Sequence, residues 1–458
     1  MPIRFAAALL FLLTAFPAAA EWKIGLGREK ITPQEPVLMG GYASRLTPFT
    51  GVDADIWVKA AAFEDSSGKV AVLVTADMLG YRQEHVAQIA ARLQQSHDLA
   101  RADLLLNSSH SHAGPLVDAT RIHEFTDNPA YGAAVERYVP TMIDATVRAA
   151  QQALDHRTSA TLAWGQGSVD FPYNRREPTP TGIVIGVNPR GPVDRSVPVL
   201  RVQGEDGKTR AVIFGTATHP ASLRGDNFRI SGDYAGFAQD EVEATLPGVQ
   251  AMFVLGCAGS SVPHPRGSLA LARKYGAELA SEVQALLQDD LAPVSGPLQT
   301  RFRMVNLPLQ RLSRAEVERE AKTRYHVYYG ERALEWLDSG RELPKAYSAP
   351  FALWRFGEGL TLVAFSGETV VDYALAAERI LGPLNLWLAG YSNEVFGYLP
   401  SARVLKDGGY ETRGVIGNRP GLFAPDAEAA VLQAVEDMAR SVGRADTGRV
   451  PSREPISK

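Results

Sequence analysis

Short runs of consecutive apolar residues, many of them β-branched, alternate along the chain with longer segments whose apolar residues lie three and four positions apart. Runs of the first kind are typical of buried strands, and segments of the second kind are typical of amphipathic helices. The runs that predict strands are residues 70–75, 103–106, 197–202, 211–214, 251–255, 360–365 and 384–388. The segments that predict helices are residues 84–95, 133–154, 235–244, 269–287, 370–380 and 427–438.

Because strands alternate with helices, the pattern predicts an α/β fold with a layered mixed β-sheet core and flanking helices. No internal repeat or shift in composition divides residues 21–440, so we expect them to form a single large domain. Residues 174–192 and 399–420 are rich in glycine and proline and predict loops, which in α/β enzymes carry chemistry at strand ends. Residues 441–458 combine glycine, proline, serine and charges, a composition that predicts a disordered tail.

The N-terminal residues 1–20 have the pattern of a secretory signal peptide. Arg4 precedes an apolar run over residues 5–16, and the alanines at 18–20 supply small residues for cleavage. The alternative is a membrane anchor, but the run is shorter than the roughly 20 residues that a spanning helix needs. We therefore expect cleavage near Ala20 and an exported, soluble mature chain, either periplasmic or secreted.

Composition adds two exclusions. The 458 residues include 47 Lys and Arg and 51 Asp and Glu, which give a net charge of −4. Proteins that bind nucleic acids usually carry a basic excess, so we expect no nucleic-acid partner. The single cysteine, Cys257, excludes an internal disulfide and a zinc site built from several thiolates.

Two histidines lie in a loop of small residues directly after the predicted strand 103–106. They are His110 and His112, in the sequence Asn-Ser-Ser-His-Ser-His-Ala-Gly-Pro over residues 107–115. Small neighbours let an ion or a substrate approach closely, so the pair is a candidate metal ligand and proton carrier. The structural alternative is a pair of loop histidines that make ordinary hydrogen bonds.

Three further candidate residues lie at the ends of predicted strands or at the start of a predicted helix. His219 follows strand 211–214, and Pro220 biases its backbone toward an extended conformation. Asp233 precedes a helix and is either a functional carboxylate or a plain N-cap. Glu368 follows strand 360–365 and is either a metal ligand or a residue that stabilises the positive end of a helix.

Taken together, His110, His219 and Glu368 form the set of two imidazoles and one carboxylate that is typical of catalytic zinc. Zinc in such a site lowers the pKa of a bound water to about 7 and polarises a carbonyl. His112 is then a candidate for proton transfer, because an unperturbed histidine titrates near ~6.5. The residues therefore predict a Zn²⁺ site that activates water, if the loops converge.

In their order along the chain, these segments resemble the N-terminal catalytic domain of the neutral/alkaline, non-lysosomal ceramidases. The resemblance begins with the Gly-x-Gly-Arg-x-x-Ile-Thr segment and includes the His-x-His-x-Gly-Pro motif. The matching segments are residues 24–33, 39–43, 110–115, 173–176, 188–194, 219–220, 231–233, 367–368 and 393–398. The resemblance implies four zinc ligands, which are His110, His219, Glu368 and Tyr398. It also implies three residues around the reaction centre, which are His112, Arg175 and Tyr410.

The reaction that the resemblance implies is zinc-dependent amide hydrolysis, which splits a ceramide into a sphingoid base and a fatty acid. Arg175 and Tyr410 are suited to stabilise the oxyanion that forms when water attacks the amide carbon. We therefore expect a lipid or other N-acyl substrate and transient contact with a membrane surface. The alternatives are a zinc hydrolase of a non-lipid N-acyl compound and a non-catalytic exported binding protein on the same fold.

The chain departs from the family pattern in two places. The family's Gly-Asp-x-Ser-Pro-Asn segment is replaced over residues 259–264, where Ser260 stands at the acidic position, Val262 at the serine and His264 at the asparagine. His264 is either a new polar group in the pocket or an exposed loop histidine, and Ser261 lies one residue from the serine position. We also expect no C-terminal immunoglobulin-like domain, which larger members of the family carry.

Overall fold

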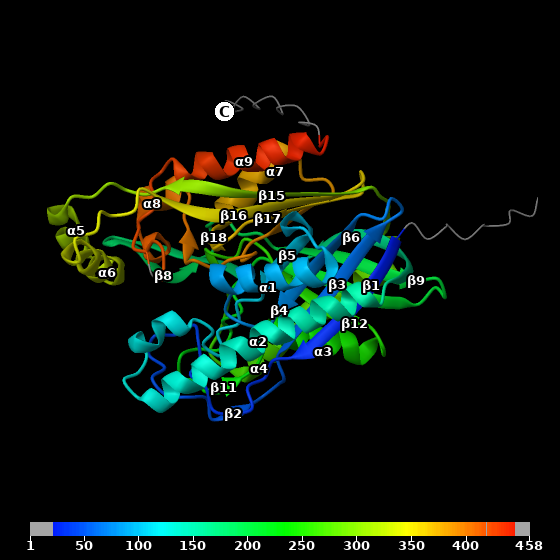
Figure 1. The fold of residues 1–458 in the computed structure, drawn as a ribbon, viewed down its shortest axis with the longest axis horizontal. Coiled ribbons are helices and arrows are strands. Elements are labelled where there is room, and N and C mark those ends of the chain that lie inside the picture. Colours follow the sequence, from blue (N-terminus) through cyan, green and yellow to red (C-terminus); the bar gives the residue numbers. More distant parts are fainter. Residues whose placement is uncertain (1–21, 418, 445–458) are drawn as a thin grey trace, which may run out of the picture.

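A computed structural model describes residues 22–417 and 419–444 of the chain (Figure 1). The predicted signal peptide and residues 445–458 of the predicted tail lie outside these residues. Two β-sheets pack face to face, and helices cover the outer face of each sheet (Figure 1). The predicted layered α/β architecture is therefore confirmed.

The larger sheet has nine strands in the order β12-β10-β9-β6-β1-β3-β4-β5, with β14 paired to β6. The pairs β4/β5 and β10/β12 are parallel and the other pairs are antiparallel, so the sheet is mixed. Its strands are β1 (Trp22–Lys30), β3 (Trp57–Asp65), β4 (Val70–Ala76), β5 (Leu104–Ser108), β6 (Thr158–Ser168), β9 (Ser196–Gly204), β10 (Thr209–Thr216), β12 (Gln250–Leu255) and β14 (Ala292–Val294).

The second sheet has the order β15-β16-β17-β19, in which only β17 and β19 are parallel. Its strands are β15 (Leu298–Pro308), β16 (Ala346–Phe356), β17 (Leu360–Ala364) and β19 (Leu386–Ala389). Large apolar side chains from both sheets form one buried cluster, with Trp22 and Trp164 from the first and Trp354 and Trp387 from the second. This burial of apolar surface holds the sheets together.

Six long helices cover the outer faces. Helices α1 (Gln83–His97), α2 (Pro129–Asp155), α3 (Asp233–Thr245) and α4 (Leu269–Gln288) pack on the larger sheet, and α7 (Val371–Leu381) and α9 (Ala427–Ser441) pack on the second (Figure 1). The apolar stripes that predicted these helices face the sheets, as expected for amphipathic helices. Among the described residues, no helix combines the length and apolar character that crossing a bilayer requires.

Shorter elements connect the layers and shape the end of the molecule where the candidate site lies. The strands are β2 (Gly51–Val52), β7 (Pro172–Thr179), β8 (Gly182–Asn188), β11 (Arg229–Ile230), β13 (Ser261–Pro263), β18 (Glu368–Thr369) and β20 (Tyr398–Leu399). The helices are α5 (Arg314–Glu320), α6 (Val327–Asp338) and α8 (Ala402–Asp407), with 3₁₀ turns η1 (Arg101–Asp103), η2 (Ala119–Glu124) and η3 (Tyr410–Thr412).

Each predicted strand and helix is present, but the predicted loops are partly wrong. Residues 174–192 form most of the β7–β8 hairpin, whose many half-exposed positions hid its alternation. Residues 399–420 include α8 and η3. Ordered structure also continues past the predicted tail boundary, because Arg444 donates hydrogen bonds to the carbonyl oxygens of Leu381 and Leu384.

Candidate active site

The loop that carries His110 begins at the end of β5, which lies beside β12 and β19. Asn107, in β5, joins these elements: its side-chain amide donates to the carbonyl of Gly390, and its side-chain oxygen accepts from the amide of Leu255. His110 then adopts a left-handed backbone conformation with φ of 59°, which turns the chain sharply. Its Nδ1 lies 2.5 Å from the carbonyl oxygen of Leu79.

His219 follows the end of β10 and is completely buried. Its Nδ1 lies 2.8 Å from the carbonyl oxygen of Ala258. The loop that follows is held by Asp233, whose carboxylate accepts from the amides of Ser222 and Leu223 at 3.3 and 3.1 Å. Gly232 is the N-cap of α3 and has no side chain, whereas the Asp233 carboxylate accepts from the amide of Tyr234 in the first turn at 2.6 Å. Asp233 therefore holds the start of the helix as well as the loop. Burial raises the pKa of the Asp233 carboxyl above its ordinary value.

Glu368 and Tyr398 are direct partners in the short parallel pairing of β18 with β20. Paired residues in a sheet point to the same face, so this pairing places a carboxylate beside a phenol. Both residues are buried. Burial raises the pKa of the Tyr398 phenol well above its ordinary value, although Arg175 beside it acts in the opposite direction.

The histidines and Glu368 meet at one point. Oε2 of Glu368 lies 3.3 Å from Nε2 of His110 and 3.1 Å from Nε2 of His219. A backbone carbonyl only accepts, so Nδ1 of each ring carries the proton and a neutral ring turns the lone pair of its Nε2 toward Glu368. Three acceptors that face one another are suited to hold a cation, and the carbonyl partners are typical of metal-binding histidines. The residues therefore fit a metal ion.

Burial and neighbouring charges shift the pKa values of His219 and Glu368, both to lower values. Burial, followed by the charge of Arg175, lowers the pKa of His219 to about 4. Burial by itself would raise the pKa of Glu368, but His110 and His219 hold it well below its ordinary value. Both directions favour the forms that bind metals, the carboxylate of Glu368 and the neutral imidazole of His219.

His112 lies beside the point where Glu368 meets His110 and His219. Both of its ring nitrogens are buried and have no partner among the described residues. Nitrogens of His110, His112 and His219 lie within 4.8 Å of one another, so His112 is itself close enough to contribute to a metal site. Burial, followed by the neighbouring His110 and His219, lowers its pKa well below the ordinary value. A neutral imidazole with free nitrogens is suited to accept and return a proton.

Arg175 comes from the β7–β8 hairpin and lies behind the histidines. Its Nη2 donates to the hydroxyl of Tyr398 at 2.8 Å, and its Nε donates to Glu411 at 2.9 Å. Glu411 also pairs with Arg176 at 2.5 Å. Burial by itself would lower the pKa of Arg175, but Tyr398 and Glu411 raise it well above its ordinary value. Sequence reasoning missed Glu411, although two adjacent arginines in a buried position require such a carboxylate.

Tyr410 stands next to Tyr398, with 5.5 Å between the ring centroids. Its hydroxyl oxygen accepts a hydrogen bond from Nη1 of Arg413 at 2.6 Å. The structure therefore brings together all seven predicted site residues. Their chemical roles stay predictions.

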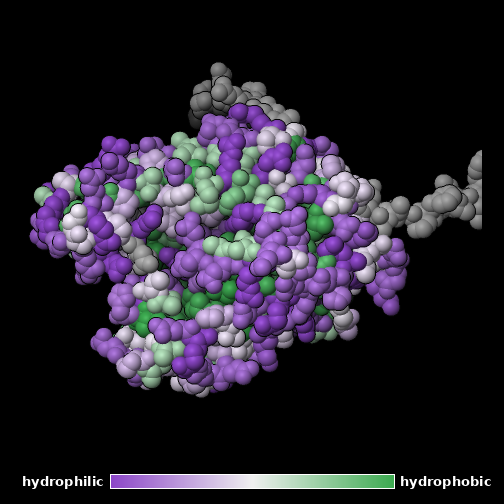
Figure 2. All heavy atoms as spheres, in the orientation of Figure 1, coloured by the Kyte–Doolittle hydropathy of each residue, from purple (hydrophilic) through white to green (hydrophobic). Residues whose placement is uncertain are grey.

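These residues open onto one pocket, which we call the histidine pocket. Its lining includes His110, His112, Glu368, Tyr398 and Tyr410, whereas His219 and Arg175 lie buried behind them. Its empty volume is about 910 Å³, part of it open to solvent. The apolar lining residues are Ala43, Leu79, Leu116, Val117, Phe125, Val395 and Ile416. Figure 2 shows hydrophobic side chains gathered in a hollow between the η2 segment and the lobe that carries α5 and α6.

The segment that departs from the family pattern has a structural part in this site. The carbonyl of Ser260 accepts from the amide of Arg175, and the carbonyl of Ser261 accepts from the amide of His219. The Ser261 hydroxyl donates to the carbonyl of Ala217, and Val262 is buried in β13. His264 is exposed and contacts the ring of Tyr173 rather than lining the histidine pocket. The exposed-loop interpretation of His264 is therefore favoured.

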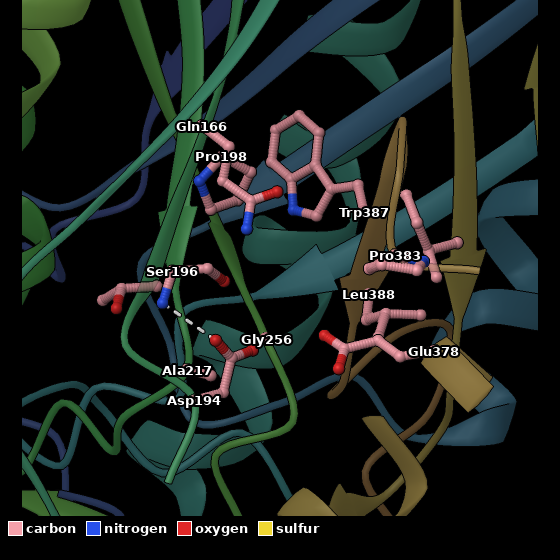
Figure 3. Close-up of a pocket in the computed structure, with 12 residues that line it drawn as sticks. Gln166, Asp194, Ser196, Pro198, Ala217, Gly256, Glu378, Pro383, Trp387 and Leu388 are labelled. Atoms are coloured by element: carbon pink, nitrogen blue, oxygen red, sulfur yellow. Dashed lines mark hydrogen bonds between the residues drawn. The ribbon is translucent and has the colours of Figure 1, made fainter. Parts of the chain in front are cut away.

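A second, smaller pocket lies between the two sheets near the ends of β10 and β19 (Figure 3). We call it the acidic pocket, because Asp194 and Glu378 point into it from opposite sides and none of its lining residues is basic (Figure 3). Burial raises the pKa of both carboxyls, and Asp194 adds to the effect on Glu378. The indole nitrogen of Trp387 and the hydroxyl of Thr216 have no partner among the described residues.

Fold and site together define a layered α/β protein with a buried histidine and carboxylate cluster that can hold a metal. A family profile described as neutral/alkaline non-lysosomal ceramidase, N-terminal, matches residues 22–263. The chain belongs to this family. The matched part contains His110, His112 and His219 but ends before Glu368, Tyr398 and Tyr410, which the structure adds to the site.

Similar proteins agree with this assignment. Neutral ceramidase B of Dictyostelium discoideum is 26% identical over 227 residues, or 48% of this chain and 31% of that protein. Neutral ceramidase A of the same organism is 26% identical over 276 residues, or 54% of this chain and 37% of that protein. The chain therefore spans about a third of the length of these curated relatives.

Solved structures show the same fold over nearly the whole chain. The crystal structure of neutral ceramidase from Pseudomonas aeruginosa aligns with a TM-score of 0.70 and 20% identity, covering 94% of this chain and 76% of that one. A ceramidase complexed with C2 also aligns with a TM-score of 0.70, at 19% identity, covering 93% of this chain and 75% of that one. At these identities the likeness concerns the fold.

Proposed function

We propose that this chain is an exported zinc amidase that hydrolyses the N-acyl bond of a ceramide or a related N-acyl lipid. The observation that carries the proposal is the meeting of His110 Nε2, His219 Nε2 and the Glu368 carboxylate, with the other nitrogen of each ring facing a backbone carbonyl. Tyr398, paired with Glu368, completes the proposed ligand set. Family membership and the names of the relatives support the substrate class, and the apolar lining of the histidine pocket suits an acyl chain.

Zinc bound in this site would polarise the amide carbonyl and lower the pKa of a water molecule. His112 has both nitrogens free, so we assign it to take a proton from the attacking water and to return it to the amide nitrogen as the C–N bond breaks. The Tyr410 hydroxyl accepts from Arg413, which leaves its own proton free to donate to the oxygen of the developing oxyanion. Arg175 contacts Tyr398 and Glu411, so we assign it to positioning Tyr398.

The test is release of fatty acid from ceramide by the purified mature chain, before chelation, after chelation and after addition of zinc. We expect release that is lost on chelation and restored by zinc. Absence of release from zinc-loaded protein on ceramide and on a panel of other N-acyl compounds would overturn the proposal and favour the non-catalytic binding protein. Export is tested separately, by fractionating cells and determining the N-terminus of the mature chain by mass spectrometry.

One observation favours a second substrate class. Three arginines line the histidine pocket, Arg82, Arg121 and Arg413, against the two carboxylates of Asp118 and Glu368. Ceramide is uncharged and offers no group that pairs with a guanidinium. A non-lipid or acidic N-acyl compound is therefore the second candidate substrate.

A further inference from the structure

The three arginines that line the histidine pocket differ in whether a carboxylate pairs with them. Arg82 lies 3.4 Å from Asp118, and Arg121 pairs with Glu124 at 2.6 Å. Arg413 lines the same pocket and is half-buried, yet no carboxylate in residues 22–417 and 419–444 forms an ion pair with it. A guanidinium that is partly removed from water without an anion costs free energy unless a ligand supplies the anion.

The surroundings of Arg413 fix where such an anion would lie. One Nη1–H donates to the Tyr410 hydroxyl, and the guanidinium lies 4.8 Å from the centre of the Tyr410 ring. These contacts hold the group beside the proposed oxyanion donor. No other hydrogen bond joins this guanidinium to residues 22–417 or 419–444. A guanidinium can present two parallel donors to one carboxylate.

We propose that Arg413 is a specificity-determining residue that binds a carboxylate on the amine side of the scissile amide, so that the favoured substrates are N-acyl amino acids with long acyl chains. This inference rests on the proposed amide hydrolysis and narrows its substrate class. We place the carboxylate on the amine side of the substrate because the acyl side is hydrocarbon and fits the apolar lining of the histidine pocket. In an N-acyl amino acid the carboxylate is attached to the carbon next to the amide nitrogen, close enough to the carbonyl for one residue pair, Tyr410 and Arg413, to contact both.

The experiment compares N-lauroylglycine with N-lauroylethanolamine, which differ only by a carboxylate in place of a hydroxymethyl group. We expect a higher kcat/KM for the acid with the native chain, and a loss of about 30-fold in the preference for the acid over the alcohol in Arg413→Gln. Arg413→Lys should recover part of the preference, because it keeps the charge without the two parallel donors. Arg419→Gln is the matched control, since Arg419 is exposed on the same loop.

A binding measurement separates this inference from the proposed function. Isothermal titration of zinc-free protein with N-lauroylglycine should show tighter binding than with N-lauroylethanolamine, and the difference should disappear in Arg413→Gln. Equal binding of both compounds, or an equal loss of activity on both in Arg413→Gln, overturns the inference and leaves Arg413 as a residue that only holds Tyr410. Absence of all hydrolysis with selective binding overturns the proposed function instead.

Discussion

The histidine pocket and the acidic pocket both contain carboxyl groups that are at least partly buried, but their surroundings act on those groups in opposite directions. Glu368 lies against His110 and His219, which hold its pKa well below the ordinary value. Asp194 and Glu378 face each other without a basic lining residue, and burial raises the pKa of both. The difference shows that a cavity with acids is not by itself a metal site. Nitrogen donors aimed at a carboxylate are what make the histidine pocket a candidate metal site.

The largest expected effect comes from removing a donor of the histidine pocket. His219→Ala should abolish zinc binding and lower fatty-acid release at least about 1000-fold, because one of the converging Nε2 atoms is lost. The measurements are zinc content by elemental analysis and initial rates, with circular dichroism to confirm folding. The matched control is His264→Ala, an exposed histidine outside the pocket. Full zinc content with full activity in His219→Ala would remove the metal assignment.

The second prediction separates metal binding from chemistry within the same pocket. Tyr410→Phe should lower kcat by about 100-fold with zinc content unchanged, because it removes the proposed oxyanion donor and the acceptor of Arg413 but none of the proposed zinc ligands. Tyr325→Phe is the control, since Tyr325 contacts the Tyr410 ring at 5.9 Å but does not line the pocket. An unchanged kcat in Tyr410→Phe would show that its hydroxyl does not act on the substrate.

A third prediction concerns how the His219 loop is held. Asp233→Ala should reduce the free energy of unfolding by about 2–3 kcal/mol and weaken zinc binding, because the buried amides of Ser222 and Leu223 lose their acceptor. Chemical denaturation and zinc titration measure the two effects. Asp233→Asn keeps one of the two acceptor oxygens and tolerates the positive φ of 52°, so its effect should be smaller than that of Asp233→Ala. Equal effects of the two substitutions would contradict this explanation.

The smallest effect is expected in the acidic pocket. The raised pKa of Glu378 means that the folded chain binds a proton there more tightly than the unfolded chain, so ionisation lowers stability as pH rises above about 4. Glu378→Gln should therefore match the native Tm at pH 4 and exceed it by about 1 °C at pH 8, with unchanged hydrolysis.

Thermal unfolding at both pH values measures this difference. Glu342→Gln, at an exposed glutamate, is the control. A Tm difference for Glu378→Gln that does not change with pH would mean that the carboxyl titrates alike in the folded and unfolded chain. A fall in hydrolysis would connect the acidic pocket to the chemistry of the histidine pocket.

Uniform burial explains several of the strands that the sequence predicted, although β3 and β16, which are also buried over most of their length, were missed. The central strands β4, β10 and β12 are buried over nearly all their length and therefore form continuous apolar runs. The long strands β6 and β15 mix exposed, half-exposed and buried residues, so no clear apolar run marks them. The hairpin β7–β8 was missed for the same reason, and its glycines and prolines suggested a loop instead.

The candidate site, like the fold, was only partly predictable from the sequence. His110, His219 and Glu368 were grouped because each follows a strand, and the structure brings them together. The placement of Tyr398, Arg175 and Tyr410 in the site rested on the family resemblance. Glu411 and Arg413 were not found, because their significance depends on partners distant in sequence: Glu411 pairs with Arg175, 236 residues away. Pairing over such distances is set by tertiary packing, which no local pattern records.

The donors of the candidate metal centre come from both halves of the chain. His110 and His219 follow strands of the larger sheet, whereas Glu368 and Tyr398 belong to the segment that carries the second sheet. A nascent chain that ends before residue 368 therefore lacks Glu368 and Tyr398 and cannot form the complete donor set. A bound ion would link these two parts of the chain. The rate of zinc release would then report how often the two parts separate.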